Sequence, residues 1–149
     1  MARKITIEII ICLLMSLFLY AGIAKIFDHR LFELQLSGSP WIGKYRTFLS
    51  VFLPCFEIVT ACLLFTKLRQ MALLLYAGSM VVFTIYIIIV LKSGVHIPCS
   101  CGGLIQNLSW PQHIALNCSS ILLTIIALLL ERKNNGIDTI SRDMQLQSV

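Results

Sequence analysis

Charged side chains are scarce in this sequence. They make up 13% of the 149 residues, and only seven of them are acidic. An ordinary soluble domain carries about 25% charged residues. Hydrophobic residues instead make up 58% of the chain, which is more apolar surface than a soluble fold of this size can bury. The composition therefore excludes an ordinary soluble globular protein.

The chain also lacks Gly/Ser-rich or Pro-rich linkers and clusters of basic residues. Its apolar residues fall in four long runs separated by short polar segments, which indicates a single domain. The net charge of +5 comes from lysines and arginines that stand singly or in pairs near the ends of these runs. Because nucleic-acid surfaces need basic residues in a stripe or patch, we expect no nucleic-acid partner.

The four apolar runs have the length of membrane-spanning helices. A helix needs about 20 mostly apolar residues to cross about 30 Å of hydrocarbon. The sequence predicts spans over residues 5–24, 48–65, 71–91 and 114–130. We therefore expect an all-α protein, an integral membrane four-helix bundle with up-and-down topology. Residues 1–133 form this bundle, and residues 134–149 form a loosely ordered polar tail.

The positive charges predict the orientation of the bundle, because Lys and Arg near span ends are retained in the cytoplasm. The side of the two termini carries Arg3, Lys4, Lys67, Arg69, Arg132 and Lys133. The opposite side carries Arg30, Lys44, Arg46 and Lys92, with Lys25 at its edge. We therefore expect a multi-pass protein of the inner cell membrane with both termini in the cytoplasm. A cleaved signal peptide is the disfavoured alternative, because the first run is long and its removal would leave three spans.

The first outer loop is rich in apolar residues. Leu31, Phe32, Leu34 and Leu36 stand among polar neighbours before a break at Gly38. This pattern predicts a short amphipathic helix at the membrane interface. The alternative is an irregular connector with apolar side chains.

The second outer loop carries the sequence HIPCSCGG at residues 96–103. Cys99 and Cys101 are close enough to form a disulfide, but so small a ring is strained, and strained exposed disulfides are the ones used for exchange. Pro98 and the two following glycines favour a tight turn. Disulfides also persist outside the cytoplasm. We therefore predict that Cys99 and Cys101 are a redox-active pair, against the alternative that both thiols are incidental.

The other four cysteines lie within the predicted spans. Cys55 and Cys118 are expected in the outer half of the membrane, where they are candidates for relaying a disulfide inward. Cys12 and Cys62 are expected in the inner half. Buried cysteine packs well as a small hydrophobe, so we favour packing within helix contacts for all four.

A metal site competes for the same loop. His96, Cys99, Cys101 and His113 offer ligands suited to zinc or cuprous copper. Structural zinc sites usually separate their cysteines by two to four residues, and the single-residue gap here argues against such a site. We therefore predict no metal site and interpret His113 as an interfacial residue at the start of the last span.

Two ionisable residues lie at the end of a predicted span or within one. Lys25 ends the first span and Glu57 lies well inside the second. A charge inside the membrane is costly unless it is paired, and antiparallel neighbouring helices bring these two together near the outer side. We predict a structural ion pair. The alternative makes Glu57 a proton acceptor for thiol or quinone chemistry, with a quinone as the candidate cofactor.

Four stretches of this chain together resemble the methylamine-utilisation MauE family, which belongs to the DoxX-like group of four-helix membrane proteins. They are AGIAKIFD at 21–28, LPCFE at 53–57, CSCG at 99–102 and LSW at 108–110. The resemblance covers about residues 5–130 in the same order and spacing. It implies a four-helix membrane protein that acts beside an extracytoplasmic thiol–disulfide pathway, because MauE-like proteins are associated with maturation of the disulfide-rich methylamine dehydrogenase.

The resemblance implies that Cys99 and Cys101 are the redox-active, catalytic pair of a membrane thiol–disulfide oxidoreductase. By their positions in the spans, Cys55, Cys118, Glu57 and Lys25 are candidates for relay or support. Its expected partner is an extracytoplasmic thioredoxin-like or disulfide-rich protein, and its expected role is maturation of a secreted redox protein. Two alternatives remain open. One is a non-enzymatic membrane assembly factor that positions a secreted enzyme, and the other is a metal-delivery protein that uses the outer Cys/His loop.

Overall fold

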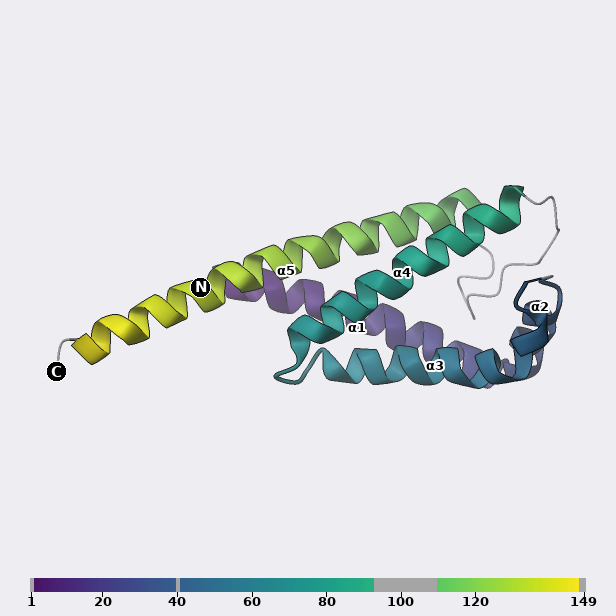
Figure 1. Cartoon of the computed structure of the whole chain (residues 1–149), viewed down its shortest axis with the longest axis horizontal. Coiled ribbons are helices and arrows are strands. Elements are labelled where there is room, and N and C mark those ends of the chain that lie inside the picture. The colour runs from purple at the N-terminus through teal and green to yellow at the C-terminus, as the bar shows by residue number, and fades with distance from the viewer. Residues whose placement is uncertain (1, 40, 93–109, 148–149) are drawn as a thin grey trace.

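The computed structural model describes residues 2–39, 41–92 and 110–147. In this part of the chain all regular structure is helical, as Figure 1 shows. The elements are α1 (Ala2–Phe27), α2 (His29–Ser37), the short 3-10 helix η1 (Gly43–Tyr45), α3 (Arg46–Leu63), α4 (Arg69–Lys92) and α5 (Trp110–Gln147). The all-α prediction is confirmed.

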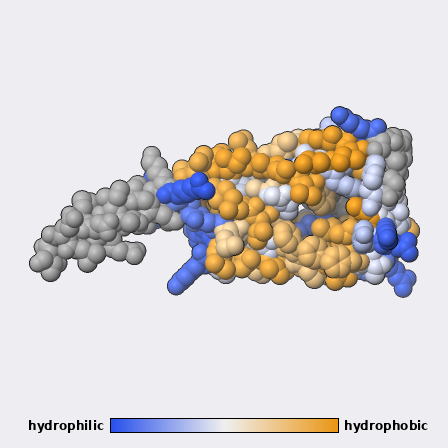
Figure 2. Space-filling view, in the orientation of Figure 1, coloured by the Kyte–Doolittle hydropathy of each residue, from blue (hydrophilic) through white to orange (hydrophobic). Residues whose placement is uncertain are grey.

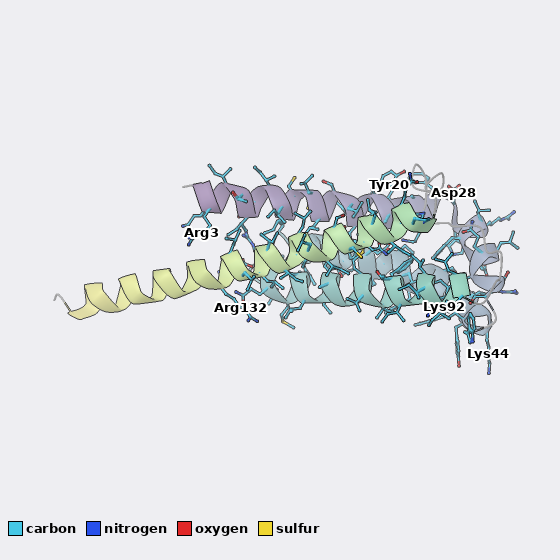
Figure 3. All side chains as sticks on the ribbon, turned by 90° about the horizontal axis from the view of Figure 1, so that it is seen from above. Arg3, Tyr20, Asp28, Lys44, Lys92 and Arg132 are labelled. Carbon is cyan, nitrogen blue, oxygen red and sulfur yellow. The ribbon has the colours of Figure 1, made fainter. Side chains whose placement is uncertain are left out.

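Four of these helices are long and apolar enough to cross a membrane. The candidate spans are Arg3–Phe27, Gly43–Leu63, Arg69–Lys92 and Pro111–Arg132. Figure 2 shows a broad apolar belt between hydrophilic atoms at both ends of the bundle. Figure 3 places the labelled Arg3 and Arg132 toward one end and Asp28, Lys44 and Lys92 at the other. The chain is therefore a multi-pass membrane protein, as predicted.

The spans follow one another around the bundle in chain order. α1 contacts α3 and α5, and α4 contacts the same two helices, so α1 and α4 face each other across the bundle. The first residues of α1 and the end of α5 lie toward the same end in Figure 1. We call this the terminal end, and we call the opposite end, where α1 and α4 finish and α5 begins, the distal end. This arrangement is the predicted up-and-down topology.

The apolar core fills the half of the bundle nearer the terminal end. Its aromatic centre is a stack of Phe18 on Tyr76, whose ring centroids are 4.0 Å apart across the bundle. The cluster of buried apolar residues comprises Ile7, Ile10, Ile11, Leu14, Phe18, Ala61, Leu64, Ala72, Leu73, Tyr76 and Ala127. On α1 these residues recur every three or four positions, which is the spacing of one helix face. The distal half holds the buried polar residues Lys25, Glu57 and His113 beside buried apolar ones.

An ion-pair network ties three helices together at the terminal end. Arg69, the first residue of α4, donates through Nη1 to Glu8 of α1 at 2.8 Å. Its Nε lies 3.5 Å from a carboxylate oxygen of Glu131 on α5. One guanidinium therefore joins α4 to both α1 and α5.

Two segments outside the predicted spans also form helices. α2 buries Phe32 and Leu36 and exposes Leu31 and Leu34, so the predicted amphipathic helix of the first loop is confirmed. Residues 134–147 were expected to be loosely ordered, but α5 continues through them to Gln147. This part of the sequence has no proline and a single glycine, so nothing in it stops a helix.

Gly22 permits a close approach of α1 to α3. A Cβ atom at this position would lie 2.9 Å from Cγ1 of Ile58 and 3.1 Å from the carbonyl oxygen of Pro54. Both distances are too short for ordinary contact, and the carbonyl belongs to the backbone. Any larger residue at 22 must therefore push the two helices apart.

Replacing Gly22 by alanine is expected to destabilise the chain by about 1–3 kcal/mol, the usual cost of overpacking. The measurement is thermal unfolding of the purified protein in detergent. Gly78→Ala is the matched control, because a Cβ at 78 would meet no heavy atom within 4 Å, and the better helix propensity of alanine predicts a neutral or slightly stabilising change there. Equal melting temperatures for the two variants would contradict the close packing of α1 on α3.

Candidate functional site

A buried ion pair lies in the distal half of the bundle. Nζ of Lys25, in the last turn of α1, is 2.5 Å from Oε1 of Glu57 on α3. Lys25 is 2% exposed and Glu57 is 7% exposed. The dipole of α1 favours a cation at that position, and a charge at membrane depth costs about 2.5–3.5 kcal/mol unless it is compensated. The predicted pairing of Lys25 with Glu57 is confirmed.

Two aromatic rings flank the Lys25 ammonium. Nζ lies 5.8 Å from the ring centroid of Phe32 on α2 and 5.7 Å from that of Phe83 on α4. Both distances are within the range of a cation–π interaction, which contributes about 0.5–2 kcal/mol. One ammonium therefore interacts with side chains from three other helices, which fixes its position.

The inward face of α5 is polar where it meets this pair. Buried polar side chains recur along it at intervals of three or four residues, namely His113, Asn117, Ser120 and Thr124. Nδ2 of Asn117 lies 3.3 Å from the hydroxyl oxygen of Thr84 on α4. Apart from His113, these polar residues were not among the candidates predicted from the sequence. Their spacing of three or four residues is the sequence signal that identifies them, because it places all four on one face of a helix.

A cavity of about 40 Å³ lies between these polar groups. Its lining combines polar and apolar side chains, namely Leu17, Phe18, Ala21, Lys25, Glu57, Met80, Phe83, His113, Leu116 and Asn117. A water molecule needs about 10–15 Å³ by this measure, whereas an engineered cavity that binds benzene measures about 150 Å³. The cavity therefore has room for a few water molecules.

The distal end is also where the predicted dithiol segment is attached. Cys99, Cys101 and His96 lie outside the described residues. Their segment, residues 93–109, joins the end of α4 at Lys92 to the start of α5 at Trp110. Both attachment points lie at the distal end, the end that also holds the Lys25–Glu57 pair.

His113 is buried inside the bundle, whereas the sequence predicted an interfacial position. It is 1% exposed and lines the cavity, so the interpretation of His113 as an interfacial residue is wrong. The physical reason is that the inward face of α5 begins in the first turn of the helix. Within the described ranges, no three His, Cys, Asp or Glu side chains are grouped as metal ligands.

The four cysteines of the spans do not pack in helix contacts. All four are exposed on the outside of the bundle, namely Cys12, Cys55, Cys62 and Cys118, so the packing interpretation is wrong for each. Among the described residues α3 and α5 have no Cα atoms within 8 Å of each other. A disulfide needs Cα atoms within about 7 Å, so the bundle does not bring Cys55 and Cys118 together.

Comparison with known proteins identifies a family. The sequence profile of the family described as "Methylamine utilisation protein MauE" matches residues 3–130. This range includes the first three candidate spans and all but the last two residues of the fourth. It also includes the buried polar residues of the distal half, which we call the polar cluster: Lys25, Glu57, His113, Asn117, Ser120 and Thr124. No curated protein and no solved structure matches this chain.

Proposed function

Because this chain belongs to the MauE family of methylamine utilisation proteins, we propose that it carries out thiol–disulfide exchange outside the cytoplasm and thereby matures a secreted redox protein. Cys99 and Cys101 are the reacting pair. The partner is a thioredoxin-like or disulfide-rich protein of the methylamine-utilisation type.

The observation that carries this proposal is the buried polar cluster at the distal end. Lys25 and Glu57 are held at 2.5 Å inside an otherwise apolar bundle, at the end where the cysteine-bearing segment joins α4 and α5. Ionisable groups at membrane depth are costly and mark functional sites by default. Thiol–disulfide exchange depends on how much of the attacking cysteine is thiolate, and a buried charged pair at the same end of the bundle supports a functional site there.

The reaction follows ordinary exchange chemistry. A thiolate of one cysteine attacks a sulfur of the partner's disulfide, and the partner's other sulfur leaves as a thiolate. The second cysteine then attacks the mixed disulfide and releases the partner as a dithiol. Two electrons pass to the partner, and Cys99 and Cys101 end as a disulfide; the reverse sequence oxidises the partner.

Labelling in intact cells tests the proposed location and state of the pair. The reagent is a membrane-impermeant maleimide, applied before and after mild reduction to a variant in which the other four cysteines are alanine. We expect labelling of Cys99 and Cys101 only after reduction, because the resting pair is a disulfide on the outer side. A Cys99→Ser/Cys101→Ser variant is the control for background.

The two other outcomes separate the alternatives. Labelling without reduction would indicate a free thiol pair or a metal site, which is the metal-delivery alternative. No labelling in either state would contradict the outside location of the segment and with it the proposed mechanism. A non-enzymatic assembly factor, in contrast, would keep its cellular function when both cysteines are serine.

A further inference from the structure

An open groove at the distal end runs along one face of α2 and reaches the first residue of α3. Its volume is about 280 Å³, and it is lined by Arg30, Glu33, Leu34, Ser37 and Arg46. The four residues from α2 follow the spacing of a single helix face, and Arg46 begins α3. The groove therefore presents side chains of two helices to one ligand, and it lies apart from the buried polar cluster.

The groove lies at the level of the lipid headgroups. α2 occupies the connection between the first two candidate spans, Arg3–Phe27 and Gly43–Leu63. Figure 3 places Asp28, just before α2, and Lys44, at the start of the next span, at the distal end. Figure 2 shows hydrophilic atoms at this end, beyond the apolar belt. An amphipathic helix in such a place lies in the interface between hydrocarbon and headgroups.

The lining of the groove carries two positive charges and one negative charge. The carboxylate of Glu33 accepts a hydrogen bond from Thr47 at 2.8 Å, which holds α3 against α2. Nε of Arg46 lies 3.8 Å from the same carboxylate, which is longer than a hydrogen bond, and the Arg46 side chain is 54% exposed. In the described part of the chain Arg30 is exposed and has no ion pair. The two guanidinium groups can therefore accommodate a further anion.

The chemistry and depth of the groove together favour a phospholipid. Guanidinium groups bind phosphate with paired, charge-assisted hydrogen bonds. Leu34 lines the same groove and is 68% exposed, so an apolar side chain stands beside the two cations, as a ligand with a phosphate and an acyl chain requires. Pockets for drug-sized ligands begin at about 300 Å³, so a groove of about 280 Å³ suits a headgroup and not a whole lipid. An acidic segment of a protein partner is the competing ligand, but it would not require a groove at headgroup level.

We propose that this groove binds the headgroup of an anionic phospholipid. Arg30 and Arg46 donate hydrogen bonds to the phosphate oxygens, and Leu34 contacts the start of an acyl chain. Basic residues near a membrane surface attract anionic lipids, and the negative charge of Glu33 limits the affinity. The bound lipid fastens α2 to the membrane surface, and its binding is independent of the proposed thiol chemistry.

Native mass spectrometry of the purified full chain in detergent tests the site. The probe is phosphatidylglycerol, titrated into delipidated protein, with phosphatidylcholine as the lipid of no net charge and inorganic phosphate as a competitor. Arg30→Gln/Arg46→Gln removes both cations of the groove. Lys44→Gln/Lys92→Gln is the matched control, because it removes two cations from the same end but outside the lining. Thermal unfolding of each variant establishes that it is folded.

We expect Arg30→Gln/Arg46→Gln to bind phosphatidylglycerol about 30-fold more weakly than the wild type, the effect of losing two basic residues beside an anionic lipid. The lysine control should bind like the wild type. Glu33→Gln should bind more tightly, because it removes the negative charge of the groove and its amide oxygen can still accept the hydrogen bond from Thr47. Phosphatidylcholine should bind more weakly than phosphatidylglycerol, and inorganic phosphate should not displace either lipid.

Four results would overturn the inference. Equal affinities of the wild type and the arginine variant would remove the role of the two guanidinium groups. An equal loss in the arginine and lysine variants would indicate attraction by overall charge, without a site. Displacement of the lipid by inorganic phosphate would make this a site for free phosphate. Equal binding of the two lipids would remove the preference for an anionic headgroup and favour an acidic protein segment as the ligand.

Discussion

Lys25→Met is expected to destabilise the protein by about 3–5 kcal/mol, the cost of removing one partner from a buried ion pair. The substitution takes the cation away from the Glu57 carboxylate, which is only 7% exposed. It also removes the cation that lies within 5.8 Å of the Phe32 ring and 5.7 Å of the Phe83 ring. The carboxylate must then be protonated or disrupt the packing around it. Thermal unfolding in detergent measures the loss.

Two further variants separate this effect from the loss of a long side chain. Lys25→Met/Glu57→Gln leaves no charge without a counter-charge, so it should recover most of the lost stability. Arg46→Met removes the cation of an exposed pair, in which Nε of Arg46 is 3.8 Å from Glu33 and the Arg46 side chain is 54% exposed. Such a pair contributes about 0–1 kcal/mol. Equal destabilisation by Lys25→Met and Arg46→Met would contradict the buried character of the Lys25–Glu57 pair.

The spans and the central ion pair were predictable from the sequence because the membrane constrains them strongly. A helix must satisfy all of its backbone hydrogen bonds in hydrocarbon, so long apolar runs allow one interpretation. A charge in the same medium requires a partner, and Lys25 and Glu57 were the candidates at matching depth in adjacent spans. The structure brings them to 2.5 Å. The amphipathic α2 was predictable because apolar and polar residues are mixed in the loop before Gly38, and Phe32 and Leu36, four residues apart, are its buried positions.

The rotation of each helix about its own axis was not predictable in the same way. Lipid tails are as apolar as a helix interface, so a cysteine has little preference between the two. All four cysteines of the spans are exposed to the surroundings of the bundle, although packing was expected. The polar face of α5 is also hard to recognise in the sequence. Asn117 and Ser120 are ordinary as single residues, and they form a polar face only together with His113, because the three lie three or four positions apart.

Contacts between distant helix ends also depend on rotation and helix length. Glu8 receives its hydrogen bond from Arg69, which is 61 residues away in the sequence, and nothing in the local pattern selects that partner. The polarity of residues 134–147 predicts loose order, but α5 continues to Gln147. Helix propensity depends on the absence of breakers more than on polarity, and this segment contains only one glycine and no proline.

Loss of either Cys99 or Cys101 is expected to have the largest effect on function, because each cysteine performs a different half of the exchange. A protein with one serine in the pair cannot complete the reaction, so turnover should fall to the uncatalysed background. The variant that keeps the attacking thiol should stop at the mixed disulfide, since no second thiol is present to resolve it. The other four cysteines are again alanine, which restricts the reaction to this pair.

Mass spectrometry of the purified, reduced protein after reaction with oxidised glutathione tests the central claim most directly. Our account predicts that the protein with both cysteines becomes an internal disulfide with little lasting adduct, and that Cys99→Ser or Cys101→Ser accumulates one stable glutathione adduct on the remaining cysteine. Stable adducts on both cysteines of the intact pair, with no internal disulfide, would contradict an exchanging dithiol. So would a pair that does not react with oxidised glutathione at all.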